Sequence, residues 1–232
     1  FEWLSLDIYP VALLVIMAGI VLCSLWVPNA QPSSLGRKLV EGGFLKQLFS
    51  PGVLAFYACV ALMQMSHGPY YTFLTLHLEG LGYSRGVIGL LWALGVVAEV
   101  LMFLAMRRIL LKFSVRRVLM FSFILAALRW LLLGSFAEHL WVLLLAQLLH
   151  AATFGSFHAS AMTFVQRSFG PGQQGQGQAL YATLAGIGGA VGALYSGYSW
   201  NTLGPTITFS MASVAALAAA VIIATRLQED RP

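Results

Sequence analysis

The stretch that decides the fold is Val87-Ile-Gly-Leu-Leu-Trp-Ala-Leu-Gly-Val-Val-Ala-Glu-Val-Leu-Met-Phe-Leu-Ala-Met106, in which Glu99 is the only charged residue. An α-helix needs about 20 predominantly apolar residues to cross the ~30 Å hydrocarbon core of a bilayer. The stretch therefore predicts a membrane-spanning helix that carries one carboxylate inside the membrane.

The rest of the chain has the same character. Of its 232 residues, 59% are hydrophobic and 9% are charged, whereas soluble domains are about 25% charged. This composition excludes a soluble enzyme, a disordered chain and a disulfide scaffold, and Cys23 and Cys59 both lie in apolar runs. We predict an all-α, polytopic helical membrane protein.

Seven segments have the length and hydropathy of a spanning helix. A polar connection, residues 28–50, separates the first two, and the GPGQQGQG stretch at 170–177 is predicted to be a flexible loop. The expected spans are 8–27, 52–76, 87–106, 118–137, 140–164, 178–199 and 205–225.

The basic residues lie in alternate connections, chiefly in 28–50 and 107–117. Cytoplasmic loops of membrane proteins carry an excess of Lys and Arg, so we expect the amino end outside and the carboxyl end in the cytoplasm. The formal net charge of +5 then reflects topology, and no nucleic-acid partner is expected.

Five ionisable residues fall inside the predicted spans, and such residues are functional candidates because burying a charge in a bilayer is costly. Helical spacing places Trp92 on the face of Glu99, and His150 on a face with Phe154, Phe157 and Ala161, with His158 at its edge. We expect Arg129 to bind a carboxylate through two parallel hydrogen bonds, and the rings to contact an apolar, possibly aromatic, body. The five residues are His67, Glu99, Arg129, His150 and His158.

Structural roles are the alternatives. Glu99 and Arg129 could form a buried ion pair, and His67 could satisfy backbone groups that the Gly68-Pro69 kink leaves free. The glycines of 186–192 lack the pattern of a nucleotide-binding loop and are predicted to pack helices. No motif of an enzyme, a metal site or a cofactor site occurs in the sequence, so we expect none of them.

Several motifs are familiar. Ser66-His-Gly-Pro-Tyr-Tyr-Thr-Phe73, Ile88-Gly-Leu-Leu-Trp-Ala-Leu-Gly-Val-Val-Ala-Glu-Val100, Arg129-Trp130 and Gln147-Leu-Leu-His-Ala-Ala-Thr-Phe154 resemble the 3-phenylpropionate permease family of the major facilitator superfamily. That family is related to proton symporters of the lactose permease type.

The resemblance implies a fold of twelve spans, of which this chain matches the sixth to the twelfth. Residues 1–27 would contain span six, residues 28–50 the cytoplasmic connection between two six-helix halves, and residues 51–232 the C-terminal six-helix bundle. The last six spans would form two inverted three-helix repeats. The N-terminal half would be a partner that this chain lacks.

The resemblance also implies site residues. Glu99 matches a substrate-binding Glu of lactose-type symporters, Arg129 an Arg that takes part in proton coupling, and His150 a His that bridges substrate and coupling. Gln147 and Thr153 replace the Lys and the proton-carrying Glu of those proteins, which leads us to expect that Glu99 takes over the proton role.

The sequence thus predicts part of a proton symporter that imports a small organic acid, possibly an aromatic one, across a bacterial inner membrane. The alternatives are a sugar or nucleoside symporter, a seven-span receptor, and a membrane protein without transport activity.

Overall fold

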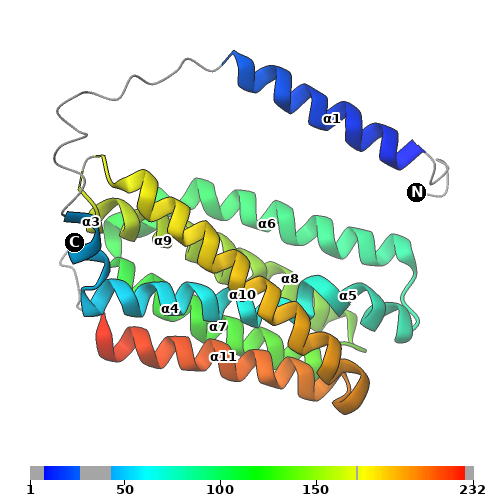
Figure 1. Ribbon diagram of the computed structural model, residues 1–232. Helices are drawn as coiled ribbons and strands as arrows, with labels where there is room; N and C mark the ends of the chain where they lie inside the picture. The colour runs from blue at the N-terminus through cyan, green and yellow to red at the C-terminus, as the bar shows by residue number, and fades with distance from the viewer. Residues whose placement is uncertain (1–7, 27–42, 171, 228–232) are drawn as a thin grey trace. The chain divides into compact units, whose positions relative to one another are not determined.

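The computed structural model describes residues 8–26, 43–170 and 172–227, which are helical with short turns and contain no strand. The chain divides into two units, residues 1–38 and 39–232. The first contains α1 (Ile8–Leu25), an 18-residue apolar helix (Figure 1). Residues 28–42 of the predicted connection lie outside the described part, and Gly43–Leu48 of that connection form the short helix α3.

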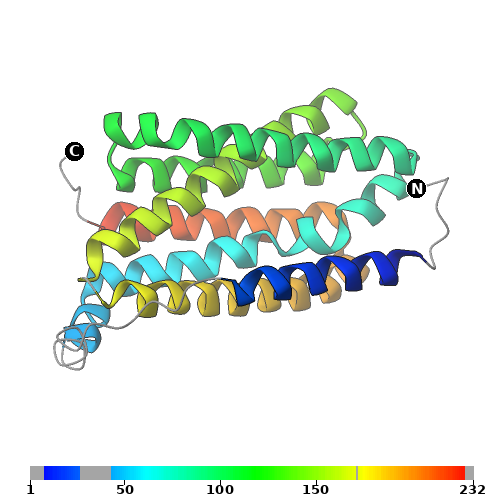
Figure 2. The ribbon, with the colours of Figure 1, turned by 90° about the horizontal axis from the view of Figure 1, so that it is seen from above.

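The second unit is a bundle of long helices that run nearly along one common direction (Figures 1 and 2). After α3, its elements are α4 (Pro51–Ser66), α5 (Gly68–Gly80), α6 (Arg85–Lys112), α7 (Val115–Ser135), α8 (Leu140–His150), η1 (Ala151–Gly155), α9 (Ser156–Ser168), α10 (Gln174–Leu203) and α11 (Pro205–Arg226).

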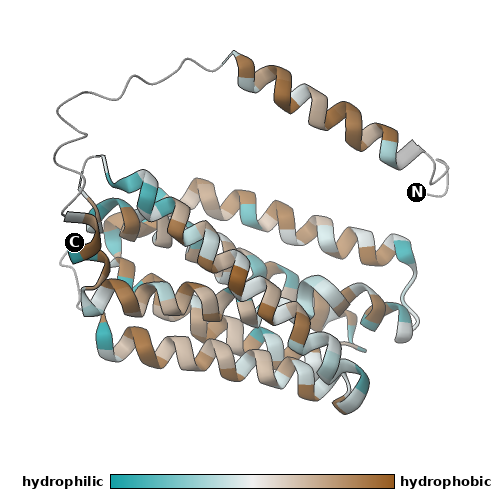
Figure 3. Cartoon of the chain, in the orientation of Figure 1, coloured by the Kyte–Doolittle hydropathy of each residue, from teal (hydrophilic) through white to brown (hydrophobic). Residues whose placement is uncertain are grey.

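Five helical segments of this unit are long and apolar enough to cross a membrane. Hydrophobic residues dominate along the helices, and many of the hydrophilic residues lie toward the helix ends (Figure 3). The prediction of an all-α polytopic membrane protein is confirmed. The five segments are Arg85–Lys112, Val115–Ser135, Leu140–Ser168, Gln174–Leu203 and Pro205–Arg226.

The second predicted span is broken into α4 and α5 at His67. Pro69 follows in the first turn of α5, where a missing N–H costs nothing because the first N–H groups of a helix have no intrahelical partner. Nδ1 of His67 lies 2.9 Å from the carbonyl oxygen of Met63, in the last turn of α4. The expected kink is present, and His67 contacts backbone beside it.

The span predicted at 140–164 also departs from a uniform α-helix. Between α8 and α9 the backbone widens into η1, a five-residue π-helical turn. Such turns insert one extra residue into a helix and are frequent at functional sites. The interruption changes which side chains share a face, and the sequence pattern did not reveal it.

The helices pair in a pattern that is symmetric between two groups of three. α4–α5, α6 and α7 form one group, and α8–η1–α9, α10 and α11 form the other. The first element of each group packs against the second and third of the other group, and α7 packs against α11. Two inverted repeats would give this arrangement, and the first element of each group is the interrupted one.

Glycine allows α4 and α10 to touch through their backbones. A Cβ on Gly188 would collide with the backbone of Ala61, and one on Gly192 would lie 2.6 Å from the carbonyl oxygen of Met65. Small residues permit such approaches between membrane helices. The packing role predicted for this glycine run is confirmed for these two positions, whereas Gly186 and Gly189 face open space.

Two predicted loops are shorter than expected. α10 begins at Gln174, so only the first part of 170–177 connects α9 to α10. Gly177 is held inside the helix because its carbonyl accepts a 2.9 Å hydrogen bond from the Tyr57 hydroxyl. Likewise, α6 continues to Lys112, which places most of the predicted 107–117 loop on helix ends.

Candidate functional site

The two interruptions meet inside the bundle. His67, at the break between α4 and α5, and His150, at the entrance to η1, have ring centroids 6.3 Å apart. Phe154 lies 5.9 Å from His67 and 5.3 Å from His150, and Tyr71 completes the group. Because the two interruptions bring imidazole and aromatic side chains from separate helices to one place inside the bundle, we take this cluster as the candidate site.

Glu99 faces the cluster from α6. Its Oε2 lies 3.5 Å from Nε2 of His150, and its side chain keeps 18% of its surface exposed. Gly155 makes this approach possible, because a Cβ there would lie 3.2 Å from Cγ of Glu99. The carboxylate of Glu99 therefore pairs with an imidazole, not with Arg129 as the alternative interpretation had it.

Arg129 of α7 is fully buried. Its Nε donates to the carbonyl of Ala146 at 2.7 Å, and its guanidinium carbon lies 4.1 Å from the ring centre of Tyr70 and 4.7 Å from that of Trp130. Longer contacts of 3.4 Å join it to Thr153 Oγ1 and to Gln147 Oε1. Within the described residues it pairs with no carboxylate, and rings stabilise its charge instead.

The expectation that Arg129 binds a ligand carboxylate through two parallel hydrogen bonds stays a prediction. The guanidinium lies behind Tyr70, and one of its N–H groups is committed to the backbone. In this conformation the ring of Tyr70 covers the buried positive charge of Arg129. A ligand in the cluster would be attracted to that charge without direct contact with the guanidinium.

Gln147 connects Tyr70 with Arg129. Its Oε1 accepts a 2.8 Å hydrogen bond from the Tyr70 hydroxyl as well as the longer one from Arg129. Gly95 of α6 lies against the same amide, because a Cβ there would come within 3.3 Å of Oε1. Gln147 therefore fixes the Tyr70 ring against the guanidinium.

Three buried nitrogen atoms of the site have no hydrogen-bond partner: Nε2 of His67, Nδ1 of His150 and Nε2 of Gln147. Leaving a buried polar atom unpaired costs free energy. Because Nδ1 of His67 donates to a carbonyl, the neutral ring presents its other nitrogen as a proton acceptor. A bound ligand could form hydrogen bonds with these three nitrogen atoms, and a proton could bind to the free nitrogen of His67.

The π-helical turn lines up three rings. His150 and Phe154 stack with an interplanar angle of 15°, and Phe154 and His158 with one of 8°. Because the π-helical turn contains one extra residue, residues four apart point in nearly the same direction here. In a uniform α-helix, with 3.6 residues per turn, each step of four residues would rotate the side chain by about 40°. We call His150, Phe154 and His158 the ring row.

Phe157 does not belong to this face, contrary to the expectation from uniform helical spacing. It is 1% exposed and packs edge-on against Phe123 of α7. Ala161 is also fully buried. His158, expected at the edge, lies in the row and its Nδ1 is 2.9 Å from the Tyr181 hydroxyl of α10.

Trp92 forms another side of the site. Its ring stacks on Tyr71 at 6.3 Å and lies 4.7 Å from Tyr70, while its Nε1 donates to Thr75 at 3.2 Å. It is half-buried, as Phe154 and His158 are. A planar apolar ligand could therefore contact several ring faces here.

Sequence reasoning undervalued two groups. Tyr70 and Tyr71 were not among the predicted site residues, yet both lie in the site. Their spacing of three and four residues from His67 was the available signal. Gln147 was noted only as a departure from a motif, and its bonds could not be read from that. Among the described residues, no three His, Cys, Asp or Glu side chains gather as metal ligands would.

Comparisons with known proteins agree with this architecture. The family model described as "MFS_1 like family" matches residues 1–211. A "Probable 3-phenylpropionic acid transporter" of Escherichia coli (strain K12) is 32% identical over 202 residues, which are 86% of this chain and 52% of the relative. The chain thus spans about half the length of that relative. No solved structure matches the chain.

Proposed function

Because the chain belongs to the MFS_1 like family of major facilitator transporters, we propose that it acts as part of a proton symporter that imports a small organic acid. Transport would proceed by alternating access, with the two halves of the transporter rocking around a site near the middle of the membrane. The observation that carries the proposal is the charge balance of the site.

Two formal charges lie in the site, the guanidinium of Arg129 and the carboxylate of Glu99, and they sum to zero. An entering carboxylate would add an uncompensated negative charge, which is costly at low dielectric. A proton taken up by the Glu99–His150 pair, whose atoms are 3.5 Å apart, would cancel it. Anion and proton would therefore bind more favourably together than singly.

The shape of the site supports an aromatic acid as the substrate. Trp92, Tyr71 and Phe154 offer ring faces and edges, and stacked or edge-on aromatic contacts contribute about 0.5–1.5 kcal/mol beyond burial of area. The similar Escherichia coli protein is named as a probable 3-phenylpropionic acid transporter, which supports the same class of substrate.

One observation supports a second candidate, a neutral sugar or nucleoside. Glu99 follows Trp92 by seven residues along α6, which places both on the same side of that helix, and Glu99 is partly exposed; a carboxylate and an indole ring on one wall of a cavity suit a hydroxylated ligand. Competition separates the two: unlabelled 3-phenylpropionate should reduce uptake of a labelled aromatic acid, and sugars should not.

The location and the partner follow from the same proposal. We place the protein in the bacterial inner membrane, with the basic ends of α6 and α7 and the end of α11 on the cytoplasmic side. A second six-helix half would cover the half-buried rings of Trp92, Phe154 and His158 and complete the cavity.

Replacement of Glu99 tests the proposal. In proteoliposomes that contain the full-length protein, Glu99→Gln should abolish uphill uptake driven by a proton gradient and leave exchange of labelled for unlabelled substrate intact. The reason is that the amide keeps the shape of the site but cannot carry a proton.

Glu79→Gln is the matched control. Glu79 pairs at 3.0 Å with Arg85, whose side chain is 92% exposed, so both activities should stay at the wild-type level. Uphill uptake that persists in Glu99→Gln would remove Glu99 from the coupling step.

A further inference from the structure

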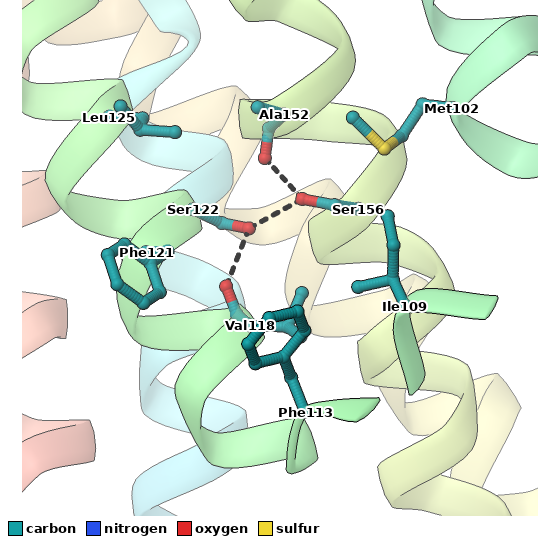
Figure 4. A pocket seen from close by; sticks show the side chains of 9 residues that line it. All are labelled: Met102, Ile109, Phe113, Val118, Phe121, Ser122, Leu125, Ala152 and Ser156. Atoms are coloured by element: carbon teal, nitrogen blue, oxygen red, sulfur yellow. Dashed lines mark hydrogen bonds between the residues drawn. The ribbon is translucent and has the colours of Figure 1, made fainter. Parts of the chain in front are cut away.

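A groove lies on the other side of the π-helical turn from the ring row. Ala152 and Ser156 form its floor, and it opens between α6 and α7 with a cavity volume of about 240 Å³ (Figure 4). We call it the α6–α7 groove. The site described above does not use it.

The groove offers no free polar group to a ligand. The hydroxyls of Ser122 and Ser156 lie 2.8 Å apart, Ser122 is 3.0 Å from the carbonyl oxygen of Val118, and Ser156 donates to the carbonyl of Ala152 (Figure 4). Each hydroxyl has one proton to donate, and backbone or neighbouring oxygens accept both. The remaining wall is apolar, which suits an alkyl chain.

The length of the groove matches one leaflet of a bilayer. It is lined along the last part of α6, from Met102 toward the helix end at Lys112, with Phe113 just beyond that end; from Met102 to Lys112 the helix rises about 15 Å at 1.5 Å per residue. Half of the hydrocarbon thickness is about 15 Å. Phe113 and Phe121 at its rim are 47% and 59% exposed, so the groove faces the surroundings of the bundle.

Positive charge lies where this groove reaches the end of the helices. Arg107, Arg108 and Lys112, in the last turns of α6, are exposed, and α7 begins with further basic residues. No acidic residue occurs anywhere between Val100 and Ala137. Basic clusters at the end of a spanning helix attract anionic lipid headgroups.

We propose that the α6–α7 groove binds one acyl chain of an anionic phospholipid, whose headgroup pairs with the basic end of α6. Three features together indicate this ligand: the apolar lining, a length close to one leaflet, and positive charge at one end. A free anion would not explain the apolar groove, and a neutral lipid would not explain the positive charge. The bound chain would lie directly against η1.

Native mass spectrometry of the purified full-length protein in detergent tests the proposal, with added phosphatidylglycerol, phosphatidylcholine or glycerol 3-phosphate. The wild type should retain one more phosphatidylglycerol than phosphatidylcholine. Ala152→Leu, which fills the groove, should lose that lipid. Arg108→Gln with Lys112→Gln should remove the preference between the two lipids.

Matched controls lie elsewhere on the bundle. Ala190→Leu adds the same side chain on an exposed face of α10, and Arg85→Gln removes a charge at the opposite end of α6; both should retain the lipid. If Ala152→Leu fails to fold, Leu125→Phe narrows the groove from its rim. Undiminished retention in the groove-filling variant, or displacement by glycerol 3-phosphate as effective as by phosphatidylglycerol, would overturn the proposal.

Discussion

Arg129 is a buried cation whose described neighbours are neutral. Tyr70 and Trp130 cover its faces, and one carbonyl and two side-chain oxygens take its N–H groups. A buried charge without partners is strongly destabilising. The rings and oxygen atoms around Arg129 together offset the cost of burying its charge. We regard the residue as the fixed charge against which the proton and the substrate anion are balanced.

Phe154 and Phe157 form a matched pair that tests the ring row. Phe154→Ala should weaken binding of an aromatic acid roughly tenfold, equivalent to about 1.4 kcal/mol, and change stability little because the ring is half-buried. Phe157→Ala should lower the free energy of unfolding by about 3–5 kcal/mol, as is typical for a buried ring.

Isothermal calorimetry and chemical unfolding of both variants in detergent give the two quantities. Binding by the folded fraction of Phe157→Ala should match the wild type. A large loss of affinity in Phe157→Ala together with none in Phe154→Ala would contradict the ring row and would place Phe157 at the ligand, as uniform helical spacing had predicted.

At the scale of elements, the two interrupted helices position the site. The break at His67 and the turn at 151–155 occupy corresponding places in two helix triplets, and their side chains meet. Interruptions free backbone groups and redirect side chains, which a continuous helix cannot do. The π-helical turn places His150 and Gly155 against Glu99, and the close contact of Gly68 with Gly192 holds the break at His67 against α10.

The glycine contact yields a prediction with an internal control. Gly188→Ala should destabilise the protein by about 1–3 kcal/mol, because the added methyl overpacks against the backbone of Ala61. Gly189→Ala, one residue away in open space, should be neutral or stabilising by up to about 1 kcal/mol, since alanine favours a helix.

Thermal or denaturant unfolding in the same detergent measures both effects. Equal stability of the two variants would mean that α4 and α10 do not pack through their backbones as described.

The sequence predicts much of this element structure, and physical reasons explain what it misses. Hydropathy and length reveal the spans because the bilayer demands both, and Pro69 reveals the first break because it lacks an N–H. Ala151-Ala-Thr-Phe-Gly155 contains no residue that demands a π-helical turn, so the turn and the exclusion of Phe157 were not predicted. Glu99, Arg129 and His150 were recognisable as rare intramembrane ionisable residues, but their pairing depends on packing between distant helices.

At the scale of the whole molecule, the chain is a membrane protein that belongs to a transporter family. It spans about half the length of its Escherichia coli relative. The bundle of residues 39–232 presents half-buried rings and a partly exposed carboxylate. Such a surface is suited to form one wall of a cavity, and the proposed second half would supply the other.

Proton movement coupled to substrate is the central claim, and simultaneous flux measurement tests it most directly. Proteoliposomes with the full-length protein and a pH-sensitive dye inside would receive labelled 3-phenylpropionate at a pH where the acid is ionised. Protein-free liposomes and Glu99→Gln correct for diffusion of the neutral acid. The account predicts that the lumen acidifies in fixed proportion to substrate taken up, and only with wild-type protein. Protein-dependent substrate uptake at unchanged lumenal pH would contradict it.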